Sequence, residues 1–323
     1  MSQSKSMLKK IVIIGGGNGS AISINAVKNF GDKVKLSAVV STSDSNGSSG
    51  LLRKEFKTLP PGDVMRAVLA MSPYDYDVLK KIFYRNRFEN CGKLDKHDLG
   101  NLFLVWAEKY AKDYMSAVRA LEQAVGAVGH VYPNSLQQSD LVAELVNGQI
   151  LKTEGKIDRP EKSASSRIKK LWLEPKVKAS SGTIKELKEA DYIIMGPGSL
   201  YTSVVAAVLP QGIKDAIKQS KAKLIYVCGN AYEKIGEKGP GKLSEFVLEL
   251  QAYLPRKIDL IIFDNAKLDK KQNHYYKEKK WNLIINDRQN IPEYNVVTGN
   301  FERTTGGLCP AKLGKILNKI IWK

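Results

Sequence analysis

The sequence predicts an α/β protein in which a mostly parallel sheet lies between two layers of helices. Five short runs are rich in Ile and Val and lack strict alternation of polar and apolar residues, which is typical of parallel strands buried on both faces. Helical patterns lie between these runs, and this alternation favours right-handed crossover connections. The five runs are Lys10–Gly15, Lys35–Val40, Asp191–Gly196, Lys223–Cys228 and Asp259–Asp264.

Helices are expected beside the strands and in one longer region of their own. Over residues 63–127, apolar residues recur every three or four positions with few strand signals, which predicts a helical insertion. Residues 131–176 are more polar and predict short strands with a turn at Asn147–Gly148. No internal repeat or long linker separates these parts, so residues 1–323 are predicted to form a single domain. The helices expected beside the strands are Ser20–Phe30, Ser199–Leu209 and Gly241–Leu254.

The net charge of +18 is the unusual feature of the composition. A basic surface raises the local concentration of polyanions and of anionic metabolites. Nucleic acid is nevertheless not an expected partner. The segment that mixes basic and aromatic residues, Lys267–Trp281, has the lysine-rich composition of a solvated surface loop. A nucleic-acid-binding protein is therefore the least favoured hypothesis.

The cysteines and the apolar runs indicate a cytoplasmic protein. Cys91, Cys228 and Cys309 have neither metal-ligand spacing nor a disulfide pattern, which fits a reducing compartment. No apolar run approaches the roughly 18 residues that a membrane span requires, so membrane insertion is not expected. The N-terminus mimics a signal peptide, but its short apolar run leads into Gly15–Gly17. A first strand is therefore the favoured interpretation.

The stretch IVIIGGGNGSAIS places a glycine-rich turn between the first strand and a helix. Glycine lets the backbone approach a ligand, and free N–H groups at a helix start attract anions. The match to the dinucleotide motif G-x-G-x-x-G is imperfect, because Ser20 stands at the third glycine and Ser41 directly follows the second strand. A nucleotide loop of another kind is favoured over a merely structural turn. Its candidate binding residues are Gly15, Gly16, Gly17, Asn18, Gly19 and Ser20.

The stretch IIMGPGSLYTS is the second turn of this type. A buried strand ends at Met195, Gly196–Gly198 makes a fixed turn, and Ser199 is placed to cap a helix that begins near Tyr201. Open α/β sheets bind ligands at the carboxyl ends of their strands, so two such turns favour a ligand site over two ordinary loops. The candidate binding residues here are Gly196, Pro197, Gly198, Ser199, Leu200, Tyr201 and Thr202.

A third loop, Ser41–Gly50, follows the second strand and leads into LLRKEF, where a helix can start. The hydroxyls of Ser48 and Ser49 are candidates to bind phosphate or ribose oxygens. Asp44 is a candidate ligand for a Mg²⁺ ion that bridges a diphosphate, since Mg²⁺ prefers oxygen ligands. The alternative is that Asp44 hydrogen-bonds its own backbone in a turn, and this choice stays open.

Two isolated polar residues complete the set of candidates. Asp63 in LPPGD is most simply the N-cap of a helix after a proline-glycine turn. His97 either donates to phosphate, acts as an acid, or is structural as lone histidines usually are. The sequence shows no pattern of a Ser–His–Asp triad or a Cys–His nucleophile. Asp44 and His97 are therefore the catalytic candidates.

Taken in order, these segments resemble the CofD/YvcK-like family, which includes 2-phospho-L-lactate transferases of the deazaflavin coenzyme pathway and bacterial gluconeogenesis factors. The resemblance covers nearly the whole chain, and PPGD, LGNL and GPGSLYTS are its most specific parts. The matching segments are IGGGNGSAIS, VVSTSDSNGSSGLLRKEF, LPPGDVMRAVLAMS, FYRNRF, KHDLGNLFL, GHVYPNS and GPGSLYTSVVAAVLPQGIKDAIKQSKAKLIYVCGN.

The resemblance implies a Rossmann-like fold with a helical insertion and a nucleotide at the carboxyl ends of the strands. That nucleotide is GDP-linked in the transferases and a UDP-sugar in the gluconeogenesis factors. Gly15–Ser20 and Gly196–Thr202 would surround it, with Asn230 nearby. The loop Asp44–Ser49, including Ser45 and Asn46, would face the phosphates or a second substrate. A homodimer is expected from the family alone.

Departures from the family pattern leave the activity open. The family loop usually has two adjacent acids and two glycines where this chain has Asp44, Ser45, Asn46 and Gly47. The first hypothesis is therefore a nucleotide- or UDP-sugar-binding protein of the gluconeogenesis-factor type, which regulates carbon metabolism, cell-wall synthesis or cell shape without catalysis. The second is a phospholactate-type transferase, which moves a phospho-linked group from a GDP-activated donor to an alcohol with Mg²⁺ on Asp44. Whether the protein is an enzyme stays undecided.

Overall fold

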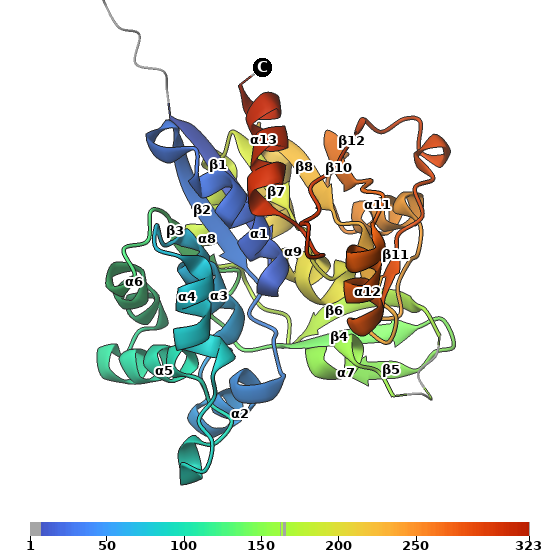
Figure 1. The fold of residues 1–323 in the computed structure, drawn as a ribbon. Helices are drawn as coiled ribbons and strands as arrows, with labels where there is room; N and C mark the ends of the chain where they lie inside the picture. Colours follow the sequence, from blue (N-terminus) through green and yellow to red (C-terminus); the bar gives the residue numbers. More distant parts are fainter. Residues whose placement is uncertain (1–7, 162, 164–165, 323) are drawn as a thin grey trace, which may run out of the picture.

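The central element of the structure is a seven-stranded sheet whose strands are all parallel (Figure 1). The structure is a computed structural model that describes residues 8–161, 163 and 166–322. The five predicted runs form five of the strands, which confirms the α/β class. Both edge strands, β3 and β12, lie outside those runs. In spatial order the strands are β12 (Val296–Gly299), β10 (Leu260–Asp264), β8 (Lys223–Cys228), β7 (Tyr192–Met195), β1 (Lys9–Gly15), β2 (Val34–Val40) and β3 (His130–Pro133).

The strand order reverses between β1 and β7. The chain leaves β1 toward β2 and β3 on one side, whereas β7 is followed by β8, β10 and β12 on the other side. Open α/β sheets form a crevice at such a switch point, beyond the carboxyl ends of the two strands. The two glycine-rich turns follow β1 and β7, so the topology itself brings them to this crevice.

Helices cover both faces of the sheet and give it three layers (Figure 1). Alternate residues of β1 point to opposite faces: Ile11 and Ile13 join one core cluster, and Val12 and Ile14 join the other. The first face packs against α1 (Gly17–Lys28), α3 (Gly62–Met71), α6 (Tyr114–Ala124) and α13 (Pro310–Ile321). The second packs against α8 (Ser181–Glu189), η4 (Leu200–Val205), α9 (Ala206–Val208), α10 (Ile213–Gln219) and α11 (Leu243–Gln251).

Residues 63–127 form helices and their connecting loops, which gather at the lower left of Figure 1. The first helix, α3, packs on the sheet, while α5 and α6 form a pair beside it. The helix α2 (Gly47–Phe56) precedes this region and begins before the LLRKEF segment. The remaining helices are η1 (Gly31–Lys33), α4 (Tyr76–Lys80), η2 (Lys81–Arg85), η3 (Gly92–Leu94), α5 (Leu99–Ala111) and η5 (Arg288–Asn290).

Two small antiparallel sheets lie beyond the carboxyl ends of the central strands. The first has the order β5–β4–β6, and its β4–β5 hairpin turns at Asn147–Gly148 as predicted. The second pairs β9 with β11, and α12 lies beside it. Of the helices in the described residues, none has the length and apolar character of a membrane span. The bounds are β4 (Asp140–Leu145), β5 (Ile150–Lys152), α7 (Glu154–Asp158), β6 (Ile168–Glu174), β9 (Ala231–Glu233), α12 (Lys270–Glu278) and β11 (Trp281–Leu283).

Candidate functional site

The first turn (Gly15–Ser20) and the second turn (Gly196–Thr202) touch each other across the switch point. The backbone at Gly19 packs so closely on the carbonyl of Pro197 that a Cβ on Gly19 would overlap it. One turn further along α1, the Ser23 hydroxyl donates to the carbonyl of Gly196 at 2.6 Å. Glycine at position 19 is therefore required for the two turns to meet.

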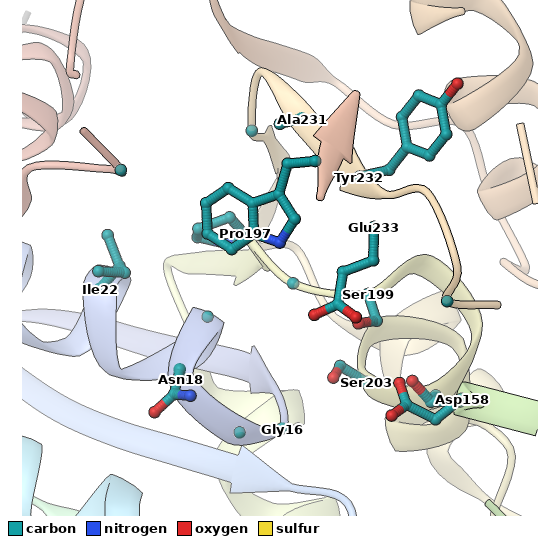
Figure 2. Close-up of a pocket in the computed structure, with 18 of the residues that line it drawn as sticks. Gly16, Asn18, Ile22, Asp158, Pro197, Ser199, Ser203, Ala231, Tyr232 and Glu233 are labelled. Carbon is teal, nitrogen blue, oxygen red and sulfur yellow. The ribbon is translucent and has the colours of Figure 1, made fainter. Parts of the chain in front are cut away.

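A cleft of about 1190 Å³ opens at these turns, at the carboxyl ends of the central strands (Figure 2). Most of the residues that the sequence singled out line it. Those lining the cleft are Gly16, Gly17, Asn18, Gly19, Asp44, Asn46, Ser48, Ser49, Pro197, Gly198, Ser199, Leu200, Thr202 and Asn230. Six candidates do not line it, namely Gly15, Ser20, Ser45, His97, Gly196 and Tyr201.

Asp63 faces the first turn and does not cap α3. Pro61 occupies the N-cap position, so the N-cap prediction for Asp63 is wrong. Its carboxylate instead lies against Gly16 and Gly17 and pairs with Arg66 at 2.6 Å. Burial raises the pKa of Asp63 to about 6, although the Arg66 guanidinium opposes this shift. A carboxylate of the protein therefore already lies at the start of α1.

The second turn also receives a carboxylate, from Glu237 in the loop after β9. Ser199 occupies the N-cap position of η4 as predicted, but its side chain makes no capping hydrogen bond. Glu237 Oε2 instead accepts hydrogen bonds from the backbone N–H groups of Tyr201 at 3.1 Å and Thr202 at 3.0 Å. Burial raises the pKa of Glu237 to about 7. Nothing in the sequence connected Glu237 to this helix start.

The third loop is shorter than expected because α2 already begins at Gly47. Ser48 and Ser49 thus lie in the first turn of a helix, where both hydroxyls have partners within the protein. Ser48 Oγ lies 2.9 Å from Nδ1 of the buried His97, and Ser49 Oγ accepts a hydrogen bond from the Gly62 N–H at 3.1 Å. His97 therefore contacts Ser48, which lines the cleft, but does not line the cleft itself.

Asp44 hydrogen-bonds the backbone of its own turn, as one of the two hypotheses for this residue predicts. Its Oδ1 accepts a hydrogen bond from the backbone N–H of Asn46 at 2.8 Å. Its second oxygen, Oδ2, lies near Gly62. Asp44 also lines the cleft, so this turn does not prevent it from binding a cation.

The sequence did not indicate that Glu154 and Asp158 of α7 belong to the site. Both line the cleft, and Glu154 Oε2 accepts a hydrogen bond from the Asn46 side chain at 3.0 Å. Burial, and next the charge of Asp44, raises the pKa of Glu154 to about 9. Burial and the charge of Glu233 raise the pKa of Asp158. Figure 2 shows Asp158 and Glu233 pointing into the same part of the pocket.

Four carboxylates gather in one part of the cleft, which we call the acidic end. They are Asp44, Asp63, Glu154 and Asp158, and the charges of the other three add to the effect of burial on the pKa of Glu154. Among the described residues, no group of three acidic, His or Cys side chains is arranged to bind a metal alone. Mg²⁺ usually takes one or two carboxylates and completes its ligands with water and substrate phosphate. The oxygen donors at this end therefore fit a Mg²⁺ ion that arrives with a phosphorylated ligand.

Comparison with known proteins agrees with the motifs and the fold. Residues 11–301 match the family of 2-phospho-L-lactate transferase CofD. A protein of Thermotoga maritima is 36% identical over 282 residues, which are 87% of each chain. The gluconeogenesis factor of Halalkalibacterium halodurans is 32% identical over 284 residues, 87% of this chain and 85% of that one. A crystal structure of a Bacillus halodurans protein covers 98% of this chain and 100% of its own at a TM-score of 0.87 and 29% identity. The chain belongs to the CofD family.

Proposed function

We propose that this protein binds a nucleotide-sugar of the UDP-sugar type in the cleft and thereby regulates carbon metabolism or cell-wall synthesis. The observation that carries the proposal is the meeting of two glycine-rich turns at the switch point of the sheet, where open α/β folds bind ligands. The relative from Halalkalibacterium halodurans is described as a gluconeogenesis factor, which supports a role of the same kind.

The size of the cleft favours an extended ligand. Small-molecule sites usually measure about 300–1,000 Å³, and this cleft of about 1190 Å³ lies above that range. A nucleotide joined to a sugar is a ligand of suitable length. Its diphosphate would lie beside the two turns, and its sugar would find a carboxylate acceptor in Asp158.

The charge at the acidic end makes a cation part of the proposal. A diphosphate beside Asp44 and Asp63 would meet repulsion, and Arg66 is already paired with Asp63. A Mg²⁺ ion bound by Asp44 and the phosphates would neutralise this charge. Binding of the nucleotide-sugar is therefore expected to depend on Mg²⁺.

The contacts of the catalytic candidates favour a binding protein over an enzyme. His97 is turned toward Ser48 and does not line the cleft, so no histidine is placed for direct proton transfer to a ligand. Ser48 and Ser49 are hydrogen-bonded within the protein. The remaining functional groups can bind and orient a ligand.

One observation supports the transferase as a second candidate. The family loop usually has a second acid where this chain has Ser45. Other carboxyl groups lie close to that position, since Glu154 of α7 contacts Asn46 and Asp63 lies near Asp44. In phosphoryl-type transfer the protein mainly positions groups and neutralises charge, which this acidic end with Mg²⁺ would do. The donor would be GDP-activated and the acceptor an alcohol. The alcohol oxygen would form the new P–O bond, the P–O bond to the nucleotide would break, and the nucleotide and the alcohol proton would be released.

Calorimetry tests the proposal directly. UDP-N-acetylglucosamine, UDP-glucose, GDP and GTP are titrated with Mg²⁺ and with a chelator. We expect a UDP-sugar to bind at least about tenfold more tightly with Mg²⁺, and Asp44→Asn to remove that difference. Asp215→Asn, a change of the same kind at an exposed site on α10, is the control. Absence of binding by all four ligands at millimolar concentration would overturn the proposal.

A turnover assay separates the two candidates. The protein is incubated with a GDP-activated donor, Mg²⁺ and a deazaflavin alcohol acceptor. If the protein is a binding regulator, no product should form. Product formation that Asp44→Asn abolishes and Asp215→Asn preserves would identify the transferase instead.

A further inference from the structure

Three aromatic side chains line the cleft on the side of α12 and β11. Tyr275 and Tyr276 come from α12, and Trp281 begins β11. The ring centroids of Tyr275 and Tyr276 lie 5.9 Å and 5.4 Å from that of Trp281, and each tyrosine ring is inclined by 84° to the indole. These edge-to-face contacts are the favoured arrangement of aromatic rings. We refer to the three side chains as the aromatic wall.

The aromatic wall is held in place from behind. The Tyr276 hydroxyl is buried and lies 2.7 Å from Asn230 Oδ1 and 2.8 Å from Glu302 Oε2. The Asn230 amide also donates to Glu302 at 3.1 Å, so Asn230 orients Tyr276 from the end of β8. The ring of Tyr275 packs so closely on Gly306 that a Cβ there would overlap it, and the φ of +97° at Gly306 also favours glycine.

Trp281 is fixed by the backbone as well as by its aromatic neighbours. In the small antiparallel sheet it pairs with Glu233, the residue whose carboxylate points into the pocket in Figure 2. The indole is only partly buried and lines the cleft. Its orientation is therefore set before any ligand arrives, which lowers the entropy cost of binding.

Apolar groups line the cleft together with the aromatic wall. Ile22 of α1, Pro197 of the second turn and Leu308 line the same cleft, and Figure 2 shows Ile22, Pro197 and Ala231 around one part of the pocket. Lys279 and Arg303 line it too. An apolar and aromatic lining with cations nearby suits a flat ring that is attached to a negatively charged group.

We propose that the aromatic wall is a subsite for a planar heteroaromatic ring, with Trp281 as its stacking surface. This inference rests on the proposed function, since the ring would be the base of the nucleotide-sugar. It also fixes the direction of the ligand: the ring lies at the aromatic wall, and the phosphates extend past the two turns toward Asp44. A tricyclic flavin-type ring has the same stacking chemistry, so the test includes both kinds of ring.

The test compares Trp281→Ala and Trp281→Phe with Trp106→Ala. Trp106 is a solvent-exposed tryptophan of α5 and does not line the cleft, which makes it a matched control. Ligands are UDP-N-acetylglucosamine, UDP and GDP for the nucleobase, riboflavin for the tricyclic ring, and glucose 1-phosphate with Mg²⁺ as a ligand without an aromatic ring. Affinities come from calorimetry, and quenching of tryptophan fluorescence reports stacking on the indole. Thermal unfolding establishes that each variant is folded.

Stacking on an aromatic side chain supports roughly a 10- to 100-fold difference in affinity. We expect Trp281→Ala to weaken nucleotide binding by this factor, Trp281→Phe to weaken it less, and Trp106→Ala and glucose 1-phosphate to show no change. Quenching should persist in Trp106→Ala and disappear in Trp281→Phe. If Trp281→Ala does not fold, Trp281→Phe and the quenching still decide the question.

The outcomes separate this inference from the proposed function. Nucleotides that bind wild type and Trp281→Ala equally would overturn the ring subsite and leave the proposed function intact. Binding of riboflavin alone, lost in Trp281→Ala, would support the subsite and overturn the nucleotide-sugar. If no ligand with an aromatic ring binds wild type, both the ring subsite and the proposed function are wrong.

Discussion

The two glycine-rich turns have the same position at the end of a strand, yet the carboxylates at their helix starts are balanced differently. At the first turn, Asp63 pairs with Arg66 at 2.6 Å and has a pKa of about 6. At the second turn, Glu237 is hydrogen-bonded by the N–H groups of Tyr201 and Thr202, and its pKa is about 7. A cation keeps the first carboxylate ionised at neutral pH, whereas the second has only neutral hydrogen-bond donors and is partly protonated.

The difference shows two ways in which a carboxylate of the protein can neutralise the partial positive charge at the start of a helix. Both helix starts attract an anion, and both are supplied with one by the protein itself. The first anion is fixed by an ion pair, so the first turn should depend on Arg66 and respond little to pH near neutrality. The charge of the second carboxylate, Glu237, depends on whether it is protonated, so the second turn should respond to pH near 7.

The largest expected effect follows from removing the cation of the first turn. Arg66→Met leaves Asp63 largely buried without its partner, which should lower the free energy of unfolding by about 2–3 kcal/mol at pH 7. The cost lies below that of a fully buried pair because both side chains keep some exposure. Urea denaturation measures the change.

The control for Arg66→Met is the double variant Asp63→Asn/Arg66→Met. It removes the unpaired charge, so it should recover a large part of the lost stability. A single variant as stable as wild type would show that the first turn does not depend on this ion pair.

The next effect, about 2–3 kcal/mol spread over a range of pH and not present at one pH, concerns the proton at Glu237. Folding raises the pKa of Glu237 from its ordinary 4.5 to about 7, so the folded state binds more protons than the unfolded state between these values. The contribution to stability is therefore complete below about pH 4.5 and is lost as the pH rises through about 7. The stability of wild type relative to Glu237→Gln should fall over this interval, as measured by urea denaturation at several pH values. A difference that stays constant from pH 4.5 to 8 would contradict the prediction.

The fold could be predicted from the sequence further than the site could. Strands such as Lys223–Cys228 are continuous apolar runs and can be recognised from the sequence. The edge strand Val296–Gly299 is short and only half-buried, so its sequence carries no such signal. The two turns were predictable because glycine is needed where they occur. The contact of Glu237 with η4 and that of Glu154 with Asn46 join segments far apart in the chain. Such contacts depend on how the small sheets lie over the cleft, which no local pattern encodes.

The smallest expected effect is that of Glu154→Gln at acidic pH, which extends the comparison to the third loop. Burial and the charge of Asp44 raise the pKa of Glu154 to about 9, so this side chain is neutral in the folded protein at pH 7 and below. A neutral carboxyl and an amide have similar shape and both accept a hydrogen bond. Near pH 4, where the unfolded carboxyl is also largely neutral, Glu154→Gln should therefore keep the contact with Asn46 and change stability by less than about 1 kcal/mol.

The same variant should separate from wild type at higher pH. The folded-state pKa is raised, so wild type loses stability as the pH rises from about 4.5 through about 9, and Glu154→Gln does not. Thermal unfolding at pH 4, pH 7 and pH 9.5 without Mg²⁺ measures both effects. Asp44→Asn provides the matched control, because it removes the neighbouring charge that adds to the effect of burial on the pKa. Destabilisation of Glu154→Gln at pH 7 by several kcal/mol would mean that Glu154 is ionised there. The acidic end would then need a bound cation even before the ligand arrives.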